Sequence, residues 1–381
     1  MTISSDRFPR LSLPLPDAPR RLGQLATLHW GLLASAVALA VVGLITVRSA
    51  TAELDGDYFV RQLIWIGAGL VAMLVAFSID YQRLLAWSLP IYVAALAALL
   101  LVLPFGYRAG GAVGWFRLGS VGLQPSEFAK LATALVLARV LAGESQRFLS
   151  WRQIGGVALV AAPPVFLTAL EPDLGGAAMF VPMVAGVLLV AGVRWKLLAS
   201  ALLALALAAG AVWSFGMKDY QRQRVATFLE PAGDPLGAGY QVRQSKIAVG
   251  SGQLTGRGYR QGTQSQLHFL PARHTDFVLA VLAEERGFVG VAVVLALYGT
   301  FFAGAATVAM RARDRGGILL VVALVAIGAF HVLYNAAMVI GLVPITGIPL
   351  PFLSYGGSFT LVNWIAVGLM LNVDFRRHVN R

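Results

Sequence analysis

The amino-acid sequence predicts an all-α membrane protein with ten transmembrane helices. Hydrophobic residues make up 58% of the 381 residues and charged residues only 13%. The apolar residues fall in blocks of roughly 20, the length that a helix needs to cross the hydrocarbon core of a bilayer. The predicted spans cover residues 29–47, 59–78, 84–104, 126–142, 153–170, 176–193, 197–216, 287–309, 316–340 and 353–372.

Residues 1–28 form a predicted cytoplasmic tail. Its stretch RFPRLSLPLPDAPRR is rich in proline and arginine, which is typical of flexible segments. Four arginines before an apolar block and the run Ala50-Thr51-Ala52 after it resemble a signal peptide. The apolar core is too long for one, so we expect the first helix to be retained.

The distribution of basic residues predicts that both termini are cytoplasmic. With the N-terminus inside, the inner connections collect Lys and Arg, as the positive-inside rule requires, whereas the connection near 49–58 is acidic. Residues 29–372 then form the membrane domain, and residues 373–381 a second cytoplasmic tail. The inner basic residues are Arg83, Arg147, Arg152, Arg194, Lys196, Arg311, Arg313, Arg315, Arg376, Arg377 and Arg381.

A long connection, residues 217–275, is expected outside the membrane between spans seven and eight. It holds eight basic and three acidic residues, and long loops cross the membrane largely regardless of their charge. The positive excess favours an anionic partner on the outer face. Attraction to anionic lipid head groups is the alternative.

Charged residues gather at the outer ends of the predicted spans, because a charge at the bilayer centre costs several kcal/mol. The segment QPSEFAK (124–130), preceded by Trp115 and Arg117, leads into the fourth span. The turn EPDLGG (171–176) joins spans five and six, and HFLPARHTDFVLAVLAEERGFVG (268–290) precedes span eight. Folded together, these segments predict one outward-facing cavity.

The QPSEFAK segment has two interpretations. Pro125 and Glu127 are ordinary residues for a helix start, and Glu127 with Lys130 at i, i+3 is compatible with a simple ion pair. However, Lys130 would lie one turn inside the apolar block, where a structural cap needs no charge. A lipid-linked anion beneath the interface would explain its position.

Asp173 and Asp276 also have structural alternatives. Asp173 is suited to a tight turn or helix cap, to holding a divalent cation, Mg²⁺ or Mn²⁺, or to orienting a basic residue. Asp276 is suited to an N-cap, but the charges continue to Glu284 and Glu285, and span eight is expected to begin at Gly287. On a helix, Asp276 and Glu284 would share a face. The residues alone leave the cap and a chemical role both open for Asp276.

Several other kinds of site are excluded by residue content. Cysteine is absent, which removes disulfides, thiolate chemistry and cysteine metal sites. The five histidines form no zinc ligand set: His29 and His378 are cytoplasmic, His331 is alone in span nine, and His268 and His274 belong to the loop. The sequence has no Walker loop and no dinucleotide fingerprint, so no organic cofactor is expected.

Four longer stretches resemble a known family. They are LEPDLGG, DPLGAGYQVRQSKIAVGSGQLTGRG, GTQSQLHFLPARHTDFVLAVLAEERG and GLVPITGIPLPFLSYGG. They resemble the SEDS family (shape, elongation, division and sporulation), membrane glycosyltransferases that polymerise lipid-linked peptidoglycan precursor. Within it, TQSQLHFLPARHTDF and GIPLPFLSYGG are more similar to the elongation branch, RodA, than to the division branch, FtsW.

The resemblance implies ten helices with the large outer loop between spans seven and eight. It also implies that the essential acidic residue is Asp276, in the motif His-Thr-Asp-Phe, and that Trp115 is the family's aromatic residue before QPSE. Family members usually place a basic residue directly before that tryptophan. This sequence has Gly114 there, with Arg117 two positions after Trp115.

The implied substrate is lipid II, a disaccharide peptide linked to undecaprenyl diphosphate. Polymerisation needs a base for the acceptor hydroxyl, for which Asp276 is the candidate, and positive charge for the departing diphosphate. A base and an anion stabiliser on opposite sides of the anomeric carbon favour inversion. Candidate substrate-binding residues are Trp115, Arg117, Gln124, Ser126, Glu127, Lys130, Arg222, Arg243, Lys246, His274, Glu285, Ser354 and Tyr355.

Two other classes of protein compete with this interpretation. A lipid II flippase would need polar groups along the whole path through the membrane, whereas the charges here lie at the outer ends. A scaffold that only recruits partners would not need Asp276. The chain has no Ser-x-x-Lys motif in a soluble domain, so crosslinking must come from another protein, and the resemblance implies that this partner is a class B penicillin-binding protein. Other elongation-complex membrane proteins are further expected partners, and nucleic acid is not.

Overall fold

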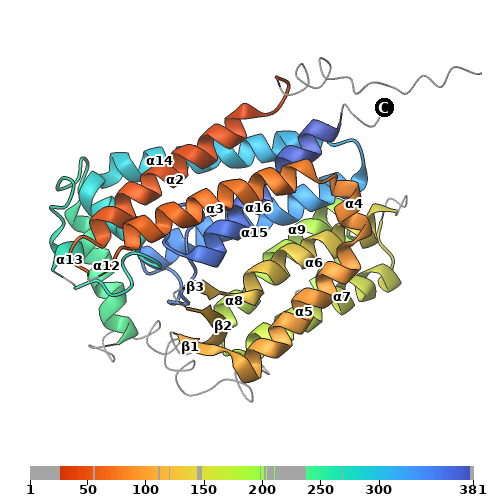
Figure 1. Cartoon of the computed structure of the whole chain (residues 1–381), viewed down its shortest axis with the longest axis horizontal. Coiled ribbons are helices and arrows are strands. Elements are labelled where there is room, and N and C mark those ends of the chain that lie inside the picture. The colour runs from red at the N-terminus through yellow and green to blue at the C-terminus, as the bar shows by residue number, and fades with distance from the viewer. Residues whose placement is uncertain are drawn as a thin grey trace, which may run out of the picture.

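The computed structural model describes residues 26–54, 56–109, 112–119, 121–143, 148–197, 199–200, 203, 210, 237–267 and 269–377. Within them the chain forms a bundle of long helices with a small sheet and two shorter helices near one end (Figure 1). The bundle helices are α2 (Trp30–Ala50), α3 (Tyr58–Ser78), α4 (Tyr81–Ala86), α5 (Ser88–Phe105), α6 (Pro125–Ala142), α7 (Trp151–Leu170), α8 (Leu174–Ala178), α9 (Phe180–Ala191), α14 (Val278–Arg311), α15 (Arg315–Val339) and α16 (Gly357–Arg376).

Eight of the described helices, counting α8 and α9 as one, are long and apolar enough to cross a membrane. Helix α6 has sufficient length but carries Glu127, Lys130 and Arg139. The predicted seventh span, residues 197–216, lies mostly outside the described residues. A multi-pass helical protein is therefore confirmed, while the number of ten spans stays a prediction.

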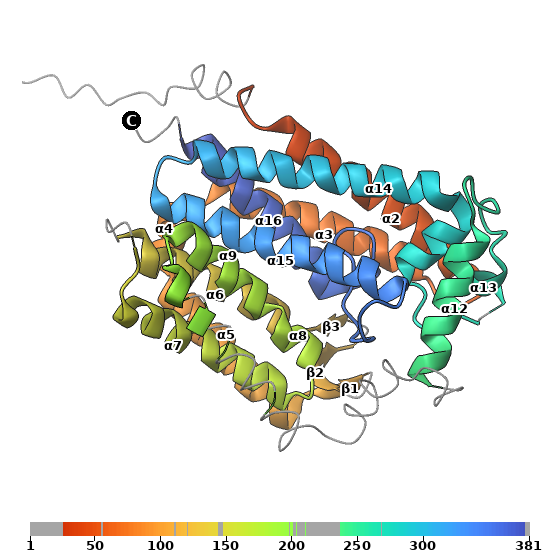
Figure 2. The same ribbon diagram turned by 180° about the vertical axis from the view of Figure 1, so that it is seen from behind.

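The helices pack in two groups. Helix α3 lies on α16 and α2 lies on α14, whereas α5, α6 and α7 form a second group. Helix α15 joins the groups, because it contacts α14, α6 and α9 (Figure 2). Large side chains from several of these elements are fully buried, among them Trp364, Tyr81, Phe180 and Phe277, so the described part of the chain shares one core.

The first and last described helices meet at one end of the bundle, here called the terminal end. The backbone N–H of His29 donates to Asp374 Oδ2 at 2.8 Å, and Arg377 pairs with the same carboxylate at 2.7 Å. Arg376 pairs with Asp80 at 3.3 Å. The other end, which holds the sheet, is here called the site end.

A three-stranded antiparallel sheet at the site end corrects the purely helical prediction. Its strands are β1 (Tyr107–Ala109), β2 (Ala112–Leu118) and β3 (Val121–Leu123), in the order β1-β2-β3. Trp115 pairs with Tyr107, and its ring packs over Gly122. The strands are short, and residues 106–122 contain six glycines. Neither an alternation of apolar and polar residues nor a high β-strand propensity therefore predicted a sheet here.

The described part of the predicted outer loop contains two helices. Helix α12 (Ala238–Ser251) packs on α14 and α15, and Ser245 Oγ donates to Val339 O at 2.7 Å. Helix α13 (Thr263–Gln266) begins at the carboxylate of Glu284, which accepts from the backbone N–H groups of Gln264 and Ser265 at 2.8 and 3.1 Å. Contacts with α14 and α15 therefore order this half of the loop.

Helix α14 begins at Val278, before the predicted start of span eight, but its backbone is non-helical at Gly287 (φ 64°, ψ −163°), so a second helical segment starts where the span was predicted to begin. The chain of residues 253–256 docks into this interruption: Phe288 N–H donates to Gln253 O at 2.8 Å. Asp276 precedes the helix, so it does not share a helical face with Glu284. The last helix also begins later than predicted, at Gly357, and runs to Arg376.

Candidate active site

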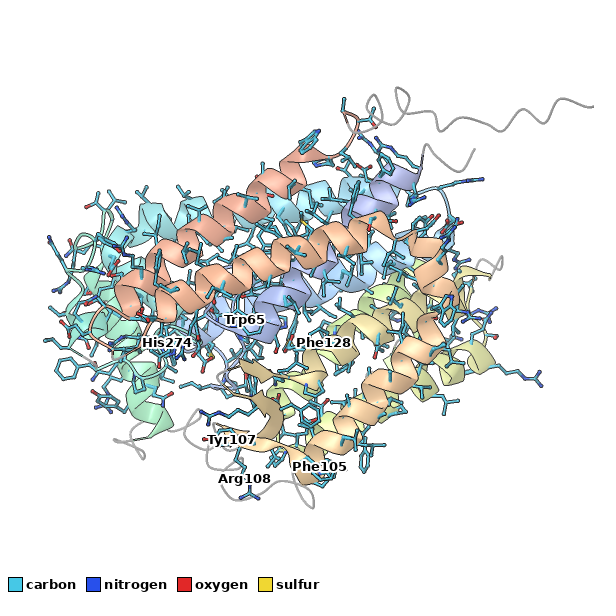
Figure 3. All side chains as sticks on the ribbon, viewed as in Figure 1. Trp65, Phe105, Tyr107, Arg108, Phe128 and His274 are labelled. Atoms are coloured by element: carbon cyan, nitrogen blue, oxygen red, sulfur yellow. The ribbon has the colours of Figure 1, made fainter. Side chains whose placement is uncertain are left out.

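Segments that are distant in the sequence meet at the site end. They are the sheet with the start of α6, the α7–α8 turn, residues 270–277 before α14, and the α15–α16 connection (residues 340–356). Figure 3 shows side chains from several of them, with His274 beside α3, and Trp65 and Phe128 on helices of the two groups. This arrangement brings together the charged segments identified in the sequence.

The backbone around Asp276 is held from several sides. Ala272 (φ 50°) accepts backbone hydrogen bonds from Thr275, Asp276 and Phe277 at 3.0 to 3.3 Å. Asn335 on α15 donates to Asp276 O and to Ile348 O, both at 2.8 Å. The half-buried carboxylate lies beside Gly347 (φ 71°), 3.6 Å from where a β-carbon would stand. A β-carbon at 347 would make an ordinary van der Waals contact with this carboxylate, and it is the positive φ that disfavours a side chain there.

Ser354, Tyr355 and His274 tie the α15–α16 connection to the residues before Asp276. Ser354 Oγ donates to Thr275 O, and the Tyr355 N–H donates to His274 O at 2.9 Å. The rings of Tyr58, His274 and Tyr355 form a cluster with centroids 5.1 to 5.6 Å apart. Burial lowers the pKa of His274, with the charge of Arg273 adding to the effect, so His274 is a neutral neighbour of Asp276 near pH 7.

The α6 residues of the QPSEFAK segment are buried. Lys130 Nζ and Glu127 Oε1 are 2.8 Å apart, and their side chains are 4% and 8% exposed. The Gln124 N–H donates to Ser358 Oγ on α16 at 2.9 Å, and Ser126 is also buried. The ion pair predicted as the structural alternative is thus present, but it is placed in the interior and not at the helix surface.

Asp173 lies close to the start of α6. It caps α8 by accepting from Gly176 N–H at 2.7 Å, and Gln124 Nε2 lies 3.4 Å from its other oxygen. The cap predicted as one alternative is therefore present. No cluster of three or more His, Cys, Asp or Glu side chains occurs among the described residues, so a cation here would need further ligands from substrate or water.

Glu171 was missed as a site residue. It is fully buried, and neither carboxylate oxygen has a hydrogen-bond partner among the described residues. A β-carbon at Gly114 would stand 3.0 Å from Oε2. Burial and, secondly, the charge of Asp173 raise the pKa of Glu171 to about 8. The available sequence signal was a second acidic residue, two positions before Asp173.

Unlike the buried Lys130, the other predicted basic residues are exposed where the structure describes them. Arg117 on β2 lies over the Tyr107 ring at 5.2 Å, and Arg243 lies on α12. Lys246, also on α12, reaches over Gly341 at the start of the α15–α16 connection. Arg222 lies outside the described residues.

Glu285, a predicted substrate-binding residue, is buried and contacts the protein's own groups. It accepts hydrogen bonds from Ser49 Oγ and from the Arg260 N–H at 3.2 Å. These contacts join α2 and residue 260 to the beginning of α14. Its position is therefore accounted for by packing of the loop.

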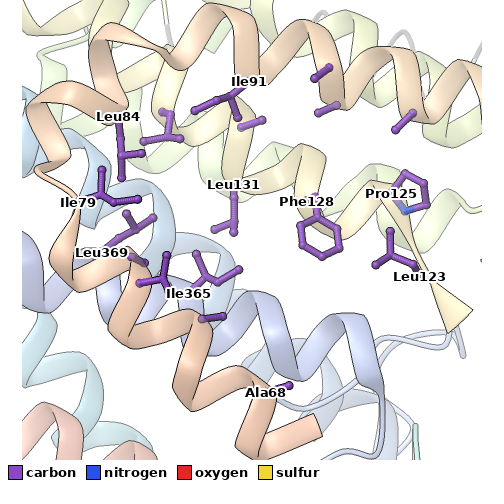
Figure 4. A pocket seen from close by; sticks show the side chains of 18 of the residues that line it. Ala68, Ile79, Leu84, Ile91, Leu123, Pro125, Phe128, Leu131, Ile365 and Leu369 are labelled. Atoms are coloured by element: carbon purple, nitrogen blue, oxygen red, sulfur yellow. The ribbon is translucent and has the colours of Figure 1, made fainter. Parts of the chain in front are cut away.

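An apolar groove of about 680 Å³ runs between the two helix groups. Its walls come from α3, α5, α6 and α16, and its lining is almost entirely aliphatic (Figure 4). It extends from Leu123 and Pro125, at the start of α6, to Ile79 and Leu84. The groove therefore connects the site end with the membrane-spanning part of the bundle.

Comparison with known proteins identifies the family. A family model described as cell cycle protein, which joins FtsW, RodA and SpoVE, matches residues 26–379. The chain belongs to the FtsW/RodA/SpoVE family. This confirms the resemblance seen in the motifs.

Relatives and solved structures of the FtsW/RodA/SpoVE family cover nearly the whole chain. Peptidoglycan glycosyltransferase MrdB of Escherichia coli (strain K12) is 39% identical over 341 residues, covering 90% of this chain and 92% of that protein. A solved structure that concerns the coordination of polymerization and crosslinking by a peptidoglycan synthase complex contains a matching chain. That chain matches with a TM-score of 0.79 and 34% identity, over 92% of this chain and 98% of its own length. RodA of Thermus thermophilus matches with a TM-score of 0.69 and 31% identity. The match covers 92% of this chain and 97% of that chain.

Proposed function

We propose that this FtsW/RodA/SpoVE family protein is a peptidoglycan glycosyltransferase that polymerises lipid II into glycan strands during cell elongation. Relatives named peptidoglycan glycosyltransferase support the activity. The observation that carries the proposal is the placement of Asp276. Its backbone is held by α15 and by residues 272–275, and its carboxylate lies at the end of the bundle where the apolar groove begins.

In the proposed reaction, a sugar hydroxyl of the acceptor attacks the anomeric carbon of the donor. Asp276 accepts the hydroxyl proton as the oxygen–carbon bond forms. The bond from the anomeric carbon to the diphosphate breaks, and undecaprenyl diphosphate leaves with the electron pair. A single displacement inverts the configuration, so an α-linked donor gives a β-linked strand.

Positive charge for the departing diphosphate comes from exposed side chains at the site end. Lys246 lies against the α15–α16 connection, and Arg243 and Arg117 are exposed nearby in the fold. Arg222 is proposed for the same role from the sequence alone. Fixed cations near a leaving group stabilise the transition state more than the ground state, because negative charge builds up on the diphosphate as its bond to the sugar breaks.

Asp173 is the proposed ligand for a divalent cation, Mg²⁺ or Mn²⁺. One carboxylate with diphosphate oxygens and water is coordination that Mg²⁺ accepts, and the Gln124 amide lies beside Asp173. The cation would supply charge neutralisation for the diphosphate. Because Asp173 also caps α8, its substitution by Asn keeps the cap and tests the cation alone.

We propose that the protein spans the bacterial inner membrane with its site end on the extracytoplasmic side. The groove, lined by side chains such as Leu131 and Ile365, would hold part of a polyprenyl chain. Both termini are proposed to be cytoplasmic, because the basic residues of the short connections lie at the terminal end. These residues include Arg83, Arg152, Arg194, Arg311, Arg313, Arg315, Arg376 and Arg377.

A class B penicillin-binding protein is the proposed partner, together with other membrane proteins of the elongation complex. The solved synthase complex, which concerns polymerization and crosslinking, supports such a partner. We expect the partner to raise the polymerisation rate and to increase protection from hydrogen exchange in residues 252–275, between α12 and Asp276. A higher rate with unchanged protection there would rule out activation through this segment.

The flippase alternative is less well supported. A polar lipid head group would need polar partners along its path, but the groove between the helix groups is almost entirely apolar. The buried Glu127–Lys130 pair faces α15 and α16 across a smaller cavity. The apolar lining of the groove suits a lipid tail better than a polar head group.

Purified protein incubated with lipid II tests the proposed function directly. Gel analysis of the product should show glycan polymer that a muramidase digests. Absence of polymer from folded protein, both alone and with a class B penicillin-binding protein, would contradict the proposal.

A further inference from the structure

A small polar cavity lies between α6, α15 and α16. Its volume is about 40 Å³, and it is lined by Glu127, Lys130, His331, Asn363 and apolar neighbours. One water molecule needs roughly 10–15 Å³ of such volume and two to four polar partners. The cavity is therefore large enough and polar enough for a water molecule.

His331 faces this cavity with one nitrogen unpaired. The residue is 2% exposed, its Nδ1 lies 3.0 Å from Pro349 O, and its Nε2 has no hydrogen-bond partner within the described part of the chain. Because a carbonyl oxygen only accepts, the neutral ring must carry its proton on Nδ1. Nε2 is then an acceptor and needs a donor.

Lys130 can provide that donor through the cavity. Its buried ammonium donates to Glu127 at 2.8 Å, which uses one of its three protons. Further acceptors lower the free energy of a buried ammonium group. A water that accepts from Lys130 and donates to His331 Nε2 would satisfy both side chains.

The other nitrogen of His331 contacts the segment that surrounds Asp276. Pro349 belongs to the α15–α16 connection, two residues after Gly347, which lies beside the Asp276 carboxylate. One turn along α15 from His331, Asn335 bonds both Ile348 O and Asp276 O. The two α15 side chains thus hold neighbouring carbonyls of the same connection.

We propose that a water molecule in this cavity bridges Lys130 and His331 Nε2, and that His331 is a positioning residue which couples the α6 ion pair to the connection that holds Asp276. This inference rests on the proposed function, since it assumes that Asp276 is the catalytic base. His331 does not touch substrate; it acts through Pro349 and Gly347.

Substitutions of His331 separate positioning from simple packing. His331→Leu fills similar space without polar atoms. We expect kcat to fall by at least about tenfold and KM for lipid II to stay unchanged, since a misplacement of about 1 Å can lower the rate by about 100-fold. His331→Gln can donate to Pro349 O and accept from the water, so it should restore most of kcat. A His331→Leu enzyme with unchanged kcat, or a His331→Gln enzyme no better than His331→Leu, would overturn the positioning role.

The water bridge has its own test. Ala366 lines the cavity, so Ala366→Val should displace the water and lower kcat without altering a polar side chain. Ala296→Val makes the same change on an exposed face of α14 and should leave kcat unchanged. If both variants keep the wild-type kcat, the water bridge is wrong.

A measurement without turnover separates this inference from the proposed function. ¹⁵N-histidine NMR, assigned with His331→Gln, should show the Nδ1–H tautomer of His331, and Lys130→Met should shift its Nε2 resonance. An unshifted resonance would overturn the bridge even if the wild type polymerises lipid II. A shifted resonance in a protein that forms no polymer would instead leave the bridge standing and contradict the proposed function.

Discussion

The carboxylate of Glu171 is buried beside Gly114 and Asp173, which holds its pKa at about 8 instead of about 4.5. Between these pH values the folded protein keeps the proton that the unfolded chain loses, so the free energy of unfolding falls as the pH rises. The slope can reach about 1.4 kcal/mol per pH unit. We expect Glu171→Gln to remove this decline and to be more stable than the wild type at pH 8.

Thermal unfolding in detergent between pH 5 and 9 measures the effect. The matched control is Glu53→Gln, because Glu53 is exposed. This variant should keep the wild-type dependence of stability on pH. Parallel profiles for Glu171→Gln and the wild type would show that Glu171 is ionised at neutral pH.

Lys246 tests the role of exposed charge at the site end. It lies over Gly341 on the α15–α16 connection. We expect Lys246→Gln to raise KM for lipid II by about two- to fivefold, an effect of one exposed charge in water, and to weaken the salt dependence of KM. Arg313→Gln removes an exposed charge at the terminal end and should change neither. Equal effects of the two substitutions would contradict a local role for Lys246.

The sequence indicated which segments carry the site, but not how each side chain is used. Asp276 and Asp173 were found because charges are rare in this chain and occur at helix ends. The unpaired state of Glu171 could not be predicted, since it depends on Gly114 in a strand from another segment. Likewise His331 looked isolated, because its partners Pro349 and Lys130 lie on other elements.

At the scale of elements, the break in α14 depends on Gly287. A β-carbon there would stand 2.4 Å from Gly256 N, and its φ of 64° with ψ of −163° disfavours other residues. We expect Gly287→Ala to lower the free energy of unfolding by about 1–3 kcal/mol from backbone strain alone, and to reduce activity because residues 253–256 can no longer dock.

Gly299→Ala is the matched control on the same helix. A β-carbon at 299 meets no atom within 4 Å, so Ala should be neutral or raise stability by up to about 1 kcal/mol. Chemical denaturation of both variants in one detergent measures the difference. A Gly287→Ala protein as stable as Gly299→Ala would mean that the break is not required.

Apolar blocks predicted the helices well because a membrane span must satisfy its own backbone hydrogen bonds. Apart from α14, the described boundaries differ from the predicted spans by at most four residues. The sheet and α12 were not predicted, because they are short elements outside the apolar blocks. Their stability comes from contacts with α5, α6, α14 and α15, which a local pattern does not contain.

At the scale of the whole molecule, the site end and the groove together favour a polymerase. Asp276 and Asp173 lie at the site end, together with the exposed basic residues Arg117, Arg243 and Lys246. An apolar groove of about 680 Å³ leads from that end along α3 and α6. A substrate with a polar head and a long lipid tail can occupy both at once. A transporter would instead need to expose polar groups at both ends of the same path in turn.

The measurement that most directly tests this account is the polymerisation rate of Asp276→Asn with lipid II. Asn keeps the shape and backbone contacts of Asp276 but is not a base, so the account predicts loss of polymer with unchanged lipid II binding and an unchanged melting temperature. The helix α14 is capped at Phe277 and not at Asp276, so a fall in stability is not expected. A folded Asp276→Asn protein that polymerises at the wild-type rate would contradict the central claim.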